Sequence, residues 1–201
     1  MELATWAEGV ARDLLEIPLP RRWAHTQGVA ATGRRLAPVL GADAELVEAA
    51  AWLHDIGYAP RLRDTGFHPL DGARYLRDVA QADPLLCRMV AHHSCALIEA
   101  AERGLAVDLS LEFRTASQRL ADALIYCDMT TGPDGQHMDV RDRIAEIRGR
   151  YGPGHIVSRA IACSAPELVA AVTRVRRKLT MCAPARPQSP FVVLVAAGQP
   201  T

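Results

Sequence analysis

The feature that most limits how this chain can fold is an ordered series of histidines and aspartates spread over more than half of its 201 residues. Five of the seven histidines belong to it together with two aspartates, in the order His25, His54, Asp55, His68, His92, His93 and Asp128. Two adjacent pairs occur, at 54/55 and 92/93, and intervals of 13 to 35 residues separate the five resulting positions, so each position must come from a different element. Histidine and carboxylate groups are the usual ligands of catalytic transition metals. The series therefore predicts that several helices or loops converge on a metal site.

The rest of the pattern is helical. Apolar residues recur at helical spacing through most of the chain, and no segment of the first 180 residues shows sustained alternation with a period of two. We expect an all-α fold with helices over 2–16, 21–40, 44–56, from 68 onward, 84–92, 95–103, 114–130, 139–149 and 165–180, and a short one from about 153. Gly57 is expected to close the third helix in a left-handed conformation, which leaves His54 and Asp55 on its last turn.

Length and composition indicate one domain over residues 1–182, followed by a proline-rich tail over 183–201. We expect this tail to be an extended segment on the body of the protein or on a neighbouring subunit, which leaves a homo-oligomer open. Lys+Arg and Asp+Glu both number 23, so net charge gives no case for a nucleic acid polymer as partner.

The chain shows neither a signal peptide nor a run of about 20 apolar residues, so we expect no membrane association. Its five cysteines are an odd number without CxxC spacing. Such cysteines indicate reduced thiols and a cytoplasmic protein.

The order H, HD, H, HH and D, with the tetrapeptide HDIG at 54–57, resembles the HD-domain metal-dependent phosphohydrolase superfamily over about residues 20–150. The resemblance implies an HD-domain helical bundle. It also implies a first metal held by His25, His54, Asp55 and Asp128, and a second held by His68 and His92 with Asp55 bridging the two. The role of His93 stays open, because the GYP sequence of the HD-GYP phosphodiesterases is missing after HHSC. His93 could bind a third metal, donate a hydrogen bond to a metal ligand, or contact the substrate.

A mixed histidine and carboxylate set suits iron or manganese, and two such ions suit hydrolysis of a phosphate ester. Arg61 and Arg63 follow HDIG closely, so we expect them to bind and polarise the phosphate, or else to be solvated loop residues. Asp71 is a candidate for orienting a ligand or donating a proton, or only favours a helix N-terminus. Thr131 is a candidate contact to a substrate oxygen.

Three functions compete. The first is a two-metal phosphohydrolase with Asp55 as a catalytic residue. Its substrate would be a small-molecule phosphate such as a nucleotide or another phosphate ester. The second is a mixed-valence di-iron oxygenase of the HD type, which uses nearly the same ligands. A binding module with a decayed metal site is disfavoured, because every position of the series is filled.

Overall fold

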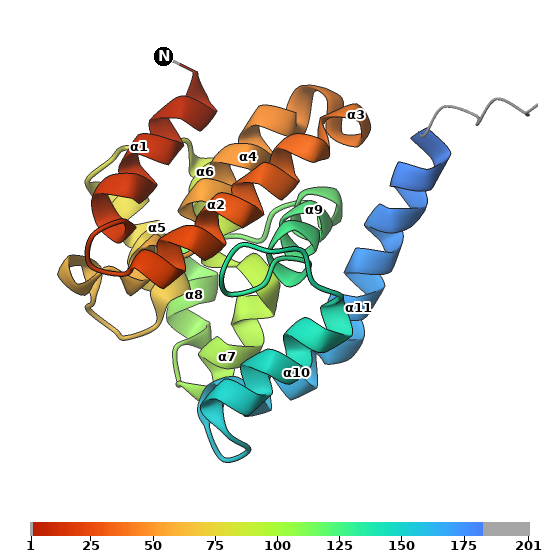
Figure 1. Ribbon diagram of the computed structural model, residues 1–201. Coiled ribbons are helices and arrows are strands. Elements are labelled where there is room, and N and C mark those ends of the chain that lie inside the picture. Colours follow the sequence, from red (N-terminus) through yellow and green to blue (C-terminus); the bar gives the residue numbers. More distant parts are fainter. Residues whose placement is uncertain (1, 183–201) are drawn as a thin grey trace, which may run out of the picture.

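The computed structural model describes residues 2–182 and is built from helices (Figure 1). In chain order they are α1 (Leu3–Leu15), α2 (Pro20–Arg35), α3 (Ala37–Leu40), α4 (Ala44–Leu53), α5 (His68–Asp78), α6 (Pro84–Ala91), α7 (Ala96–Glu102), α8 (Ala106–Glu112), α9 (Gln118–Met129), α10 (Val140–Tyr151) and α11 (Ile156–Cys182). Within this part of the chain no strand forms, and one isolated bridge joins Thr131 to His137. The expectation of an all-α fold is confirmed. The predicted tail at 183–201 lies outside the described residues.

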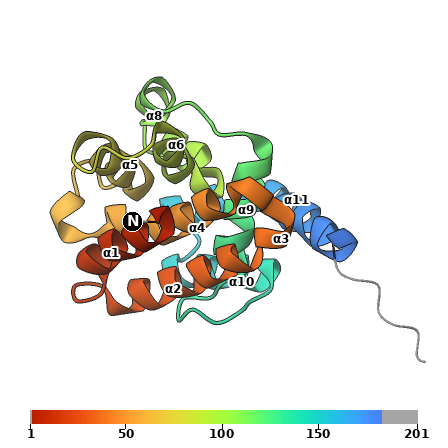
Figure 2. The same ribbon diagram turned by 90° about the horizontal axis from the view of Figure 1, so that it is seen from above.

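Helix α4 runs through the middle of the larger core, with α1 and α2 on one side and α5 and α6 on the other (Figure 2). Three consecutive alanines near its C-terminal end, Ala49, Ala50 and Ala51, are fully buried. Small side chains allow the backbones of neighbouring helices to approach closely, and the stacked rings of Trp23 and Trp52, 5.5 Å apart, fill space between α2 and α4. The C-terminal end of α4, where the HDIG sequence begins, is thereby fixed deep in the protein.

A second apolar cluster joins α9 and α10 to α11, through side chains such as Ile125, Ile144 and Leu168. The sequence predicted a short helix from about 153 and another over 165–180, but α11 is continuous and contains Pro166. Proline removes one hydrogen bond of a helix, and here burial of the apolar face against α9 and α10 outweighs that loss. Among the described residues, α11 is also the one helix long and apolar enough to span a membrane by length and composition. The sequence predicted no such segment, and core helices of folded domains meet the same criterion.

The turn after α4 differs from its prediction. Helix α4 ends at Leu53, and a short 3-10 helix over Ile56–Tyr58 follows. Gly57 does not adopt a positive φ. It is required for another reason, since a Cβ atom at this position would lie 2.0 Å from the carbonyl oxygen of His68. This close approach brings the HDIG turn against the first residue of α5.

Candidate metal centre

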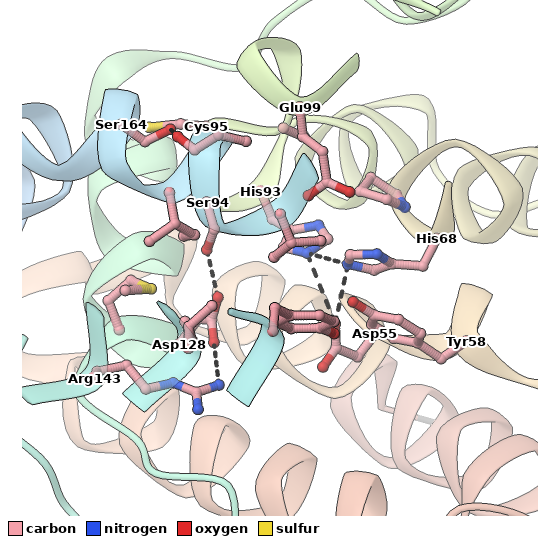
Figure 3. A pocket seen from close by; sticks show the side chains of 18 of the residues that line it. Asp55, Tyr58, His68, His93, Ser94, Cys95, Glu99, Asp128, Arg143 and Ser164 are labelled. Carbon is pink, nitrogen blue, oxygen red and sulfur yellow. Dashed lines mark hydrogen bonds and ion pairs between the residues drawn. The ribbon is translucent and has the colours of Figure 1, made fainter. Parts of the chain in front are cut away.

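Six members of the histidine and aspartate series meet in the centre of the molecule, brought there by five separate segments. They are His25 on α2, His54 and Asp55 directly after α4, His68 at the first position of α5, His93 in a 3-10 turn after α6, and Asp128 on the last turn of α9. Figure 3 shows four of these side chains, those of Asp55, His68, His93 and Asp128, around one cavity. His25 and Asp128 are 103 residues apart in sequence, yet their side chains lie 3.1 Å apart.

The six residues form two groups. In each group, one candidate ligand atom from each member lies within 4.8 Å of those of the other two. The first consists of His25, His54 and Asp128, all buried, and the second of Asp55, His68 and His93.

Asp55 connects the two groups through its two carboxylate oxygens. Its Oδ2 lies 3.3 Å from Nε2 of His54 and 3.9 Å from Nε2 of His25. Its Oδ1 lies 3.3 Å from Nε2 of His68 and 3.8 Å from Nε2 of His93. A carboxylate with one oxygen directed at each group is in the position to bridge two cations.

Backbone carbonyls orient three of the histidines. Nδ1 of His25 contacts the carbonyl oxygen of Gly132 at 3.0 Å, Nδ1 of His54 that of Ala51 at 2.8 Å, and Nδ1 of His93 that of Val90 at 2.7 Å. A carbonyl can only accept, so the ring proton must be on Nδ1 in each case. The Nε2 atom of each ring therefore has a free lone pair directed into the site, as metal-binding histidines require.

These lone pairs face other acceptors. Nε2 of His54 is buried and has no hydrogen-bond partner among the described residues. Nε2 of His25 lies 3.1 Å from Oδ1 of Asp128, and Nε2 of His93 lies 3.8 Å from Oδ1 of Asp55. Acceptors at such distances repel each other unless a proton or a cation lies between them. A divalent metal bound at each group would accept these lone pairs. The residues thus fit such metals.

The pKa shifts of His68, Asp55 and Asp128 also favour metal binding, whereas that of His54 does not, because burial lowers its pKa but the nearby Asp55 and Asp128 outweigh burial and raise it. Burial lowers the pKa of His68 to about 3, with the nearby His93 and Arg22 adding to the fall while Asp55 opposes it. Burial raises the pKa of Asp55, but Arg22 and His54 outweigh it and hold this pKa well below its usual range. Burial raises the pKa of Asp128, but its contacts with His25, His54 and Arg143 together hold this pKa below its usual range. Neutral histidine and ionised aspartate are the forms that bind metals.

His92, which the sequence analysis assigned to the second metal, is placed elsewhere. Its Nε2 lies 2.7 Å from the carbonyl oxygen of Phe113, and it lines a different cavity. His92 is the C-cap of α6, and the chain then turns through Ser94 and Cys95, which have φ values of 48° and 62°. This left-handed turn directs the two neighbouring histidines to different sides, so His93 takes the position expected of His92.

Arg61 and Arg63 do not reach the site either. Both are exposed, and Arg61 lines a shallow hollow beside Asp64 and Arg74 on the outside of α5. Nearness to HDIG in the sequence was a poor guide, because the short 3-10 helix at Pro60–Leu62 carries this loop along the surface. The expectation that these two arginines contact a substrate at this cavity is corrected.

Asp71 and Thr131 have structural roles in place of the predicted ones. The carboxylate of Asp71 accepts hydrogen bonds from the backbone of Asp64, Thr65 and Gly66 and from the Thr65 hydroxyl, so it holds the loop before α5. The hydroxyl of Thr131 donates to the carbonyl oxygen of Cys127 at 2.7 Å, and neither residue lines the central cavity.

Other arginines lie where Arg61 and Arg63 were expected. Arg22, Arg143 and Arg150 line the cavity that holds the histidine and aspartate groups. Their spacing contained a usable signal, since Arg22 lies one turn before His25 on α2, and residues 143 and 150 fall on one face of α10.

Arg22 is held in a stack of side chains. It donates a hydrogen bond to Oδ2 of Asp55 at 2.6 Å, and its guanidinium lies 4.1 Å from the centre of the Tyr58 ring. Tyr58 in turn stacks on His68, with ring centroids 3.9 Å apart. Burial raises the pKa of Tyr58 well above its usual value, and Arg22 offsets only part of this rise. Tyr58 therefore stays protonated and can act as a hydrogen-bond donor at the cavity wall.

Comparison with known families agrees with this geometry. A family model described as HD domain matches residues 22–147, which is more than half of the chain. The match spans every member of both groups. Searches of curated proteins and of solved structures give no significant match.

Proposed function

Because the chain belongs to the HD-domain family, and because its two histidine and aspartate groups share one cavity with three arginines, we propose that it is a metal-dependent phosphohydrolase. Its substrate would be a nucleotide or another small phosphate ester, and its site would be binuclear. The observation that carries this proposal is the position of Asp55, with one carboxylate oxygen directed at each group.

His25, His54 and Asp128 would hold one ion, His68 and His93 the other, and Asp55 both. This mixed set of nitrogen and oxygen ligands favours iron or manganese, whereas magnesium prefers sites made of oxygen ligands alone. When bound, a pair of divalent cations supplies charge that neutralises phosphate oxygens and lowers the pKa of water.

The residues of the chain itself bind and orient the ester. Arg143 and Arg150 on α10 can donate charge-assisted hydrogen bonds to phosphate oxygens, which are stronger than hydrogen bonds between neutral groups. Tyr58 can donate another from the opposite wall. The backbone carbonyls behind His25, His54 and His93 prevent ring rotation, so the ligand atoms stay directed into the site.

The test is to isolate the protein without oxygen, count its metals, and measure phosphate release and oxygen uptake on the same sample. We expect two ions per chain and phosphate release from small phosphate esters. Asp55→Ala should remove both metal and activity, because both ions would lose the shared carboxylate. His137→Ala, a change of an exposed histidine outside both groups, should leave metal content unchanged.

Oxygen uptake with no phosphate release would instead favour the di-iron oxygenase, which uses similar ligands. Normal metal content and turnover in Asp55→Ala would contradict the bridging role. The cytoplasmic location and a small-molecule partner stay predictions from the sequence.

A further inference from the structure

A groove lined by four arginines lies beside the candidate metal centre. It is formed by the start of α2, the loop after α9, and α10, and its volume is about 310 Å³. The arginines are Arg21, Arg22, Arg143 and Arg150, and three prolines and a leucine supply the apolar part of its wall.

This groove adjoins the central cavity. Arg22, Arg143 and Arg150 line both of them. His25, whose Nε2 faces Asp128, also lines the groove. A molecule with one end at the histidine and aspartate groups could therefore extend into the groove.

The lining of the groove is positively charged, and the carboxylates that pair with Arg21 and Arg22, those of Asp134 at 2.9 Å and Asp55 at 2.6 Å, lie outside this lining. Within residues 2–182, no aspartate or glutamate lines it. Arg143 and Arg150 share one acidic partner, Glu146, at 2.6 Å and 3.5 Å, and Arg143 also lies 3.9 Å from Asp128. The side chain of Arg143 is only 3% exposed, and its Nε–H has no acceptor in the described part of the chain. An unsatisfied charged donor of this kind is costly, and an anionic ligand would relieve that cost.

The sizes of the two spaces differ. The volume of the central cavity is about 80 Å³. One water molecule needs roughly 10 to 15 Å³ of cavity volume, so the central cavity has room for roughly six groups of that size. That suffices for a phosphoryl group but not for a sugar or a base. The part of the substrate that is released from the phosphoryl group must therefore lie outside the central cavity.

We infer that this released part of the substrate carries a second anionic group, a phosphate or a carboxylate, which binds in the groove between α2 and α10. The inference rests on the proposed phosphohydrolase function and specifies its substrate class. A third cavity, of about 350 Å³, borders His93 on the other side, but no arginine or lysine of the described chain lines it. A neutral, apolar leaving part would bind there instead.

Binding calorimetry with phosphonates, which are not hydrolysed, tests the inference on the manganese-loaded protein. The matched probes are 4-phosphonobenzoate and 4-carbamoylphenylphosphonate, which share a shape and differ in one charge. We expect the probe with the carboxylate to bind at least about tenfold more tightly than the neutral probe, which is the gain that one charged hydrogen bond would give. Benzene-1,4-diphosphonate, measured in parallel, shows whether a phosphate-like group is preferred to a carboxylate.

The preference should depend on the groove. Arg21→Gln combined with Arg150→Gln should reduce the ratio of the two affinities toward one. Arg141→Gln combined with Arg148→Gln makes the same change in charge on exposed residues of α10 that line neither space, and should keep the ratio.

Equal affinities for the charged and neutral probes, or a preference that survives the double variant, would overturn the inference. Preference for the neutral probe would place the leaving part in the apolar cavity and also overturn it. These outcomes are separate from those for the proposed function. A protein that binds the charged probe more tightly but releases phosphate from no ester would retain the anion site and lose the hydrolase assignment.

Discussion

The hydroxyl of Ser94 donates a hydrogen bond to Oδ2 of Asp128 (Figure 3), and Oδ1 of the same carboxylate faces Nε2 of His25. Ser94 achieves this from a backbone conformation that serine rarely adopts, with φ at 48° and Cys95 after it at 62°. Non-glycine residues in this region are strained, and such strain is concentrated at functional sites. The turn therefore serves both to direct His93 inward and to orient Asp128.

Loss of this hydroxyl should weaken metal binding without loss of the fold. Ser94→Gly removes the hydrogen bond to Asp128 while suiting the positive φ, so we expect metal affinity to fall by about 10- to 100-fold, as is typical for a partner behind a ligand. Stability of the metal-free protein should not fall. Competition with a chelator measures the affinity. Cys95→Gly relaxes the same turn but keeps the Ser94 hydroxyl, and an equal loss in that variant would show that the backbone, not the hydrogen bond, matters.

The neighbouring pair His92 and His93 allows a direct test of the second ion. His93→Ala should lower the metal content from two ions to one, because the second group then keeps only His68 and Asp55. His92→Ala should keep two ions and lose only a hydrogen bond to Phe113, which contributes about 1 kcal/mol. Elemental analysis after dialysis gives both counts. Two ions in His93→Ala together with one in His92→Ala would restore the assignment made from the sequence.

The sequence predicted the helical class because helical periodicity is a local property, and it named most members of the two histidine and aspartate groups because their order follows a family pattern. It could not choose between His92 and His93. That choice depends on the left-handed turn at Ser94 and Cys95, residues that do not usually adopt this conformation. Nor could it choose between Arg61 and Arg143 for the cavity, since proximity in space comes from the packing of α10 and not from distance along the chain.

Gly57 should be the least replaceable glycine near the site. A Cβ atom in Gly57→Ala would lie 2.0 Å from the His68 carbonyl oxygen and 2.7 Å from the backbone nitrogen of Gly72, so the start of α5 would have to move. We expect destabilisation of about 1 to 3 kcal/mol or more in denaturant unfolding, with weaker binding of the second ion. Gly149→Ala is the matched control. It lies in α10 with no atom within 4 Å of the added Cβ, and should stabilise the protein by about 0.5 to 1 kcal/mol. Equal stability of both variants would show that the HDIG turn tolerates a shift.

The attachment of α11 to α9 should depend on pH through Asp122. This carboxylate is 2% exposed and accepts hydrogen bonds from Nε and Nη2 of Arg174, both at 2.7 Å, and from Gln118 at 2.8 Å. Burial raises the pKa of Asp122, but the hydrogen bonds from Arg174 and Gln118 outweigh it and hold this pKa below the ordinary value of 3.8.

A carboxylate with a lowered pKa in the folded state contributes stability that is present above its unfolded pKa and lost as the pH falls through its folded pKa. The contribution of Asp122 should therefore be complete at pH 7 and decline below about pH 4. Asp122→Asn keeps the shape of the side chain but removes its charge. Its free energy of unfolding should be lower than that of the unchanged protein by about 1 kcal/mol at pH 7, with the gap closing at acid pH. Urea unfolding of the metal-free protein at several pH values measures this gap, and Glu167→Gln, at a more exposed partner of Arg174, serves as the control. A gap that stays constant down to pH 3 would mean that packing of the Asp122 side chain, rather than its charge, attaches α11 to the bundle.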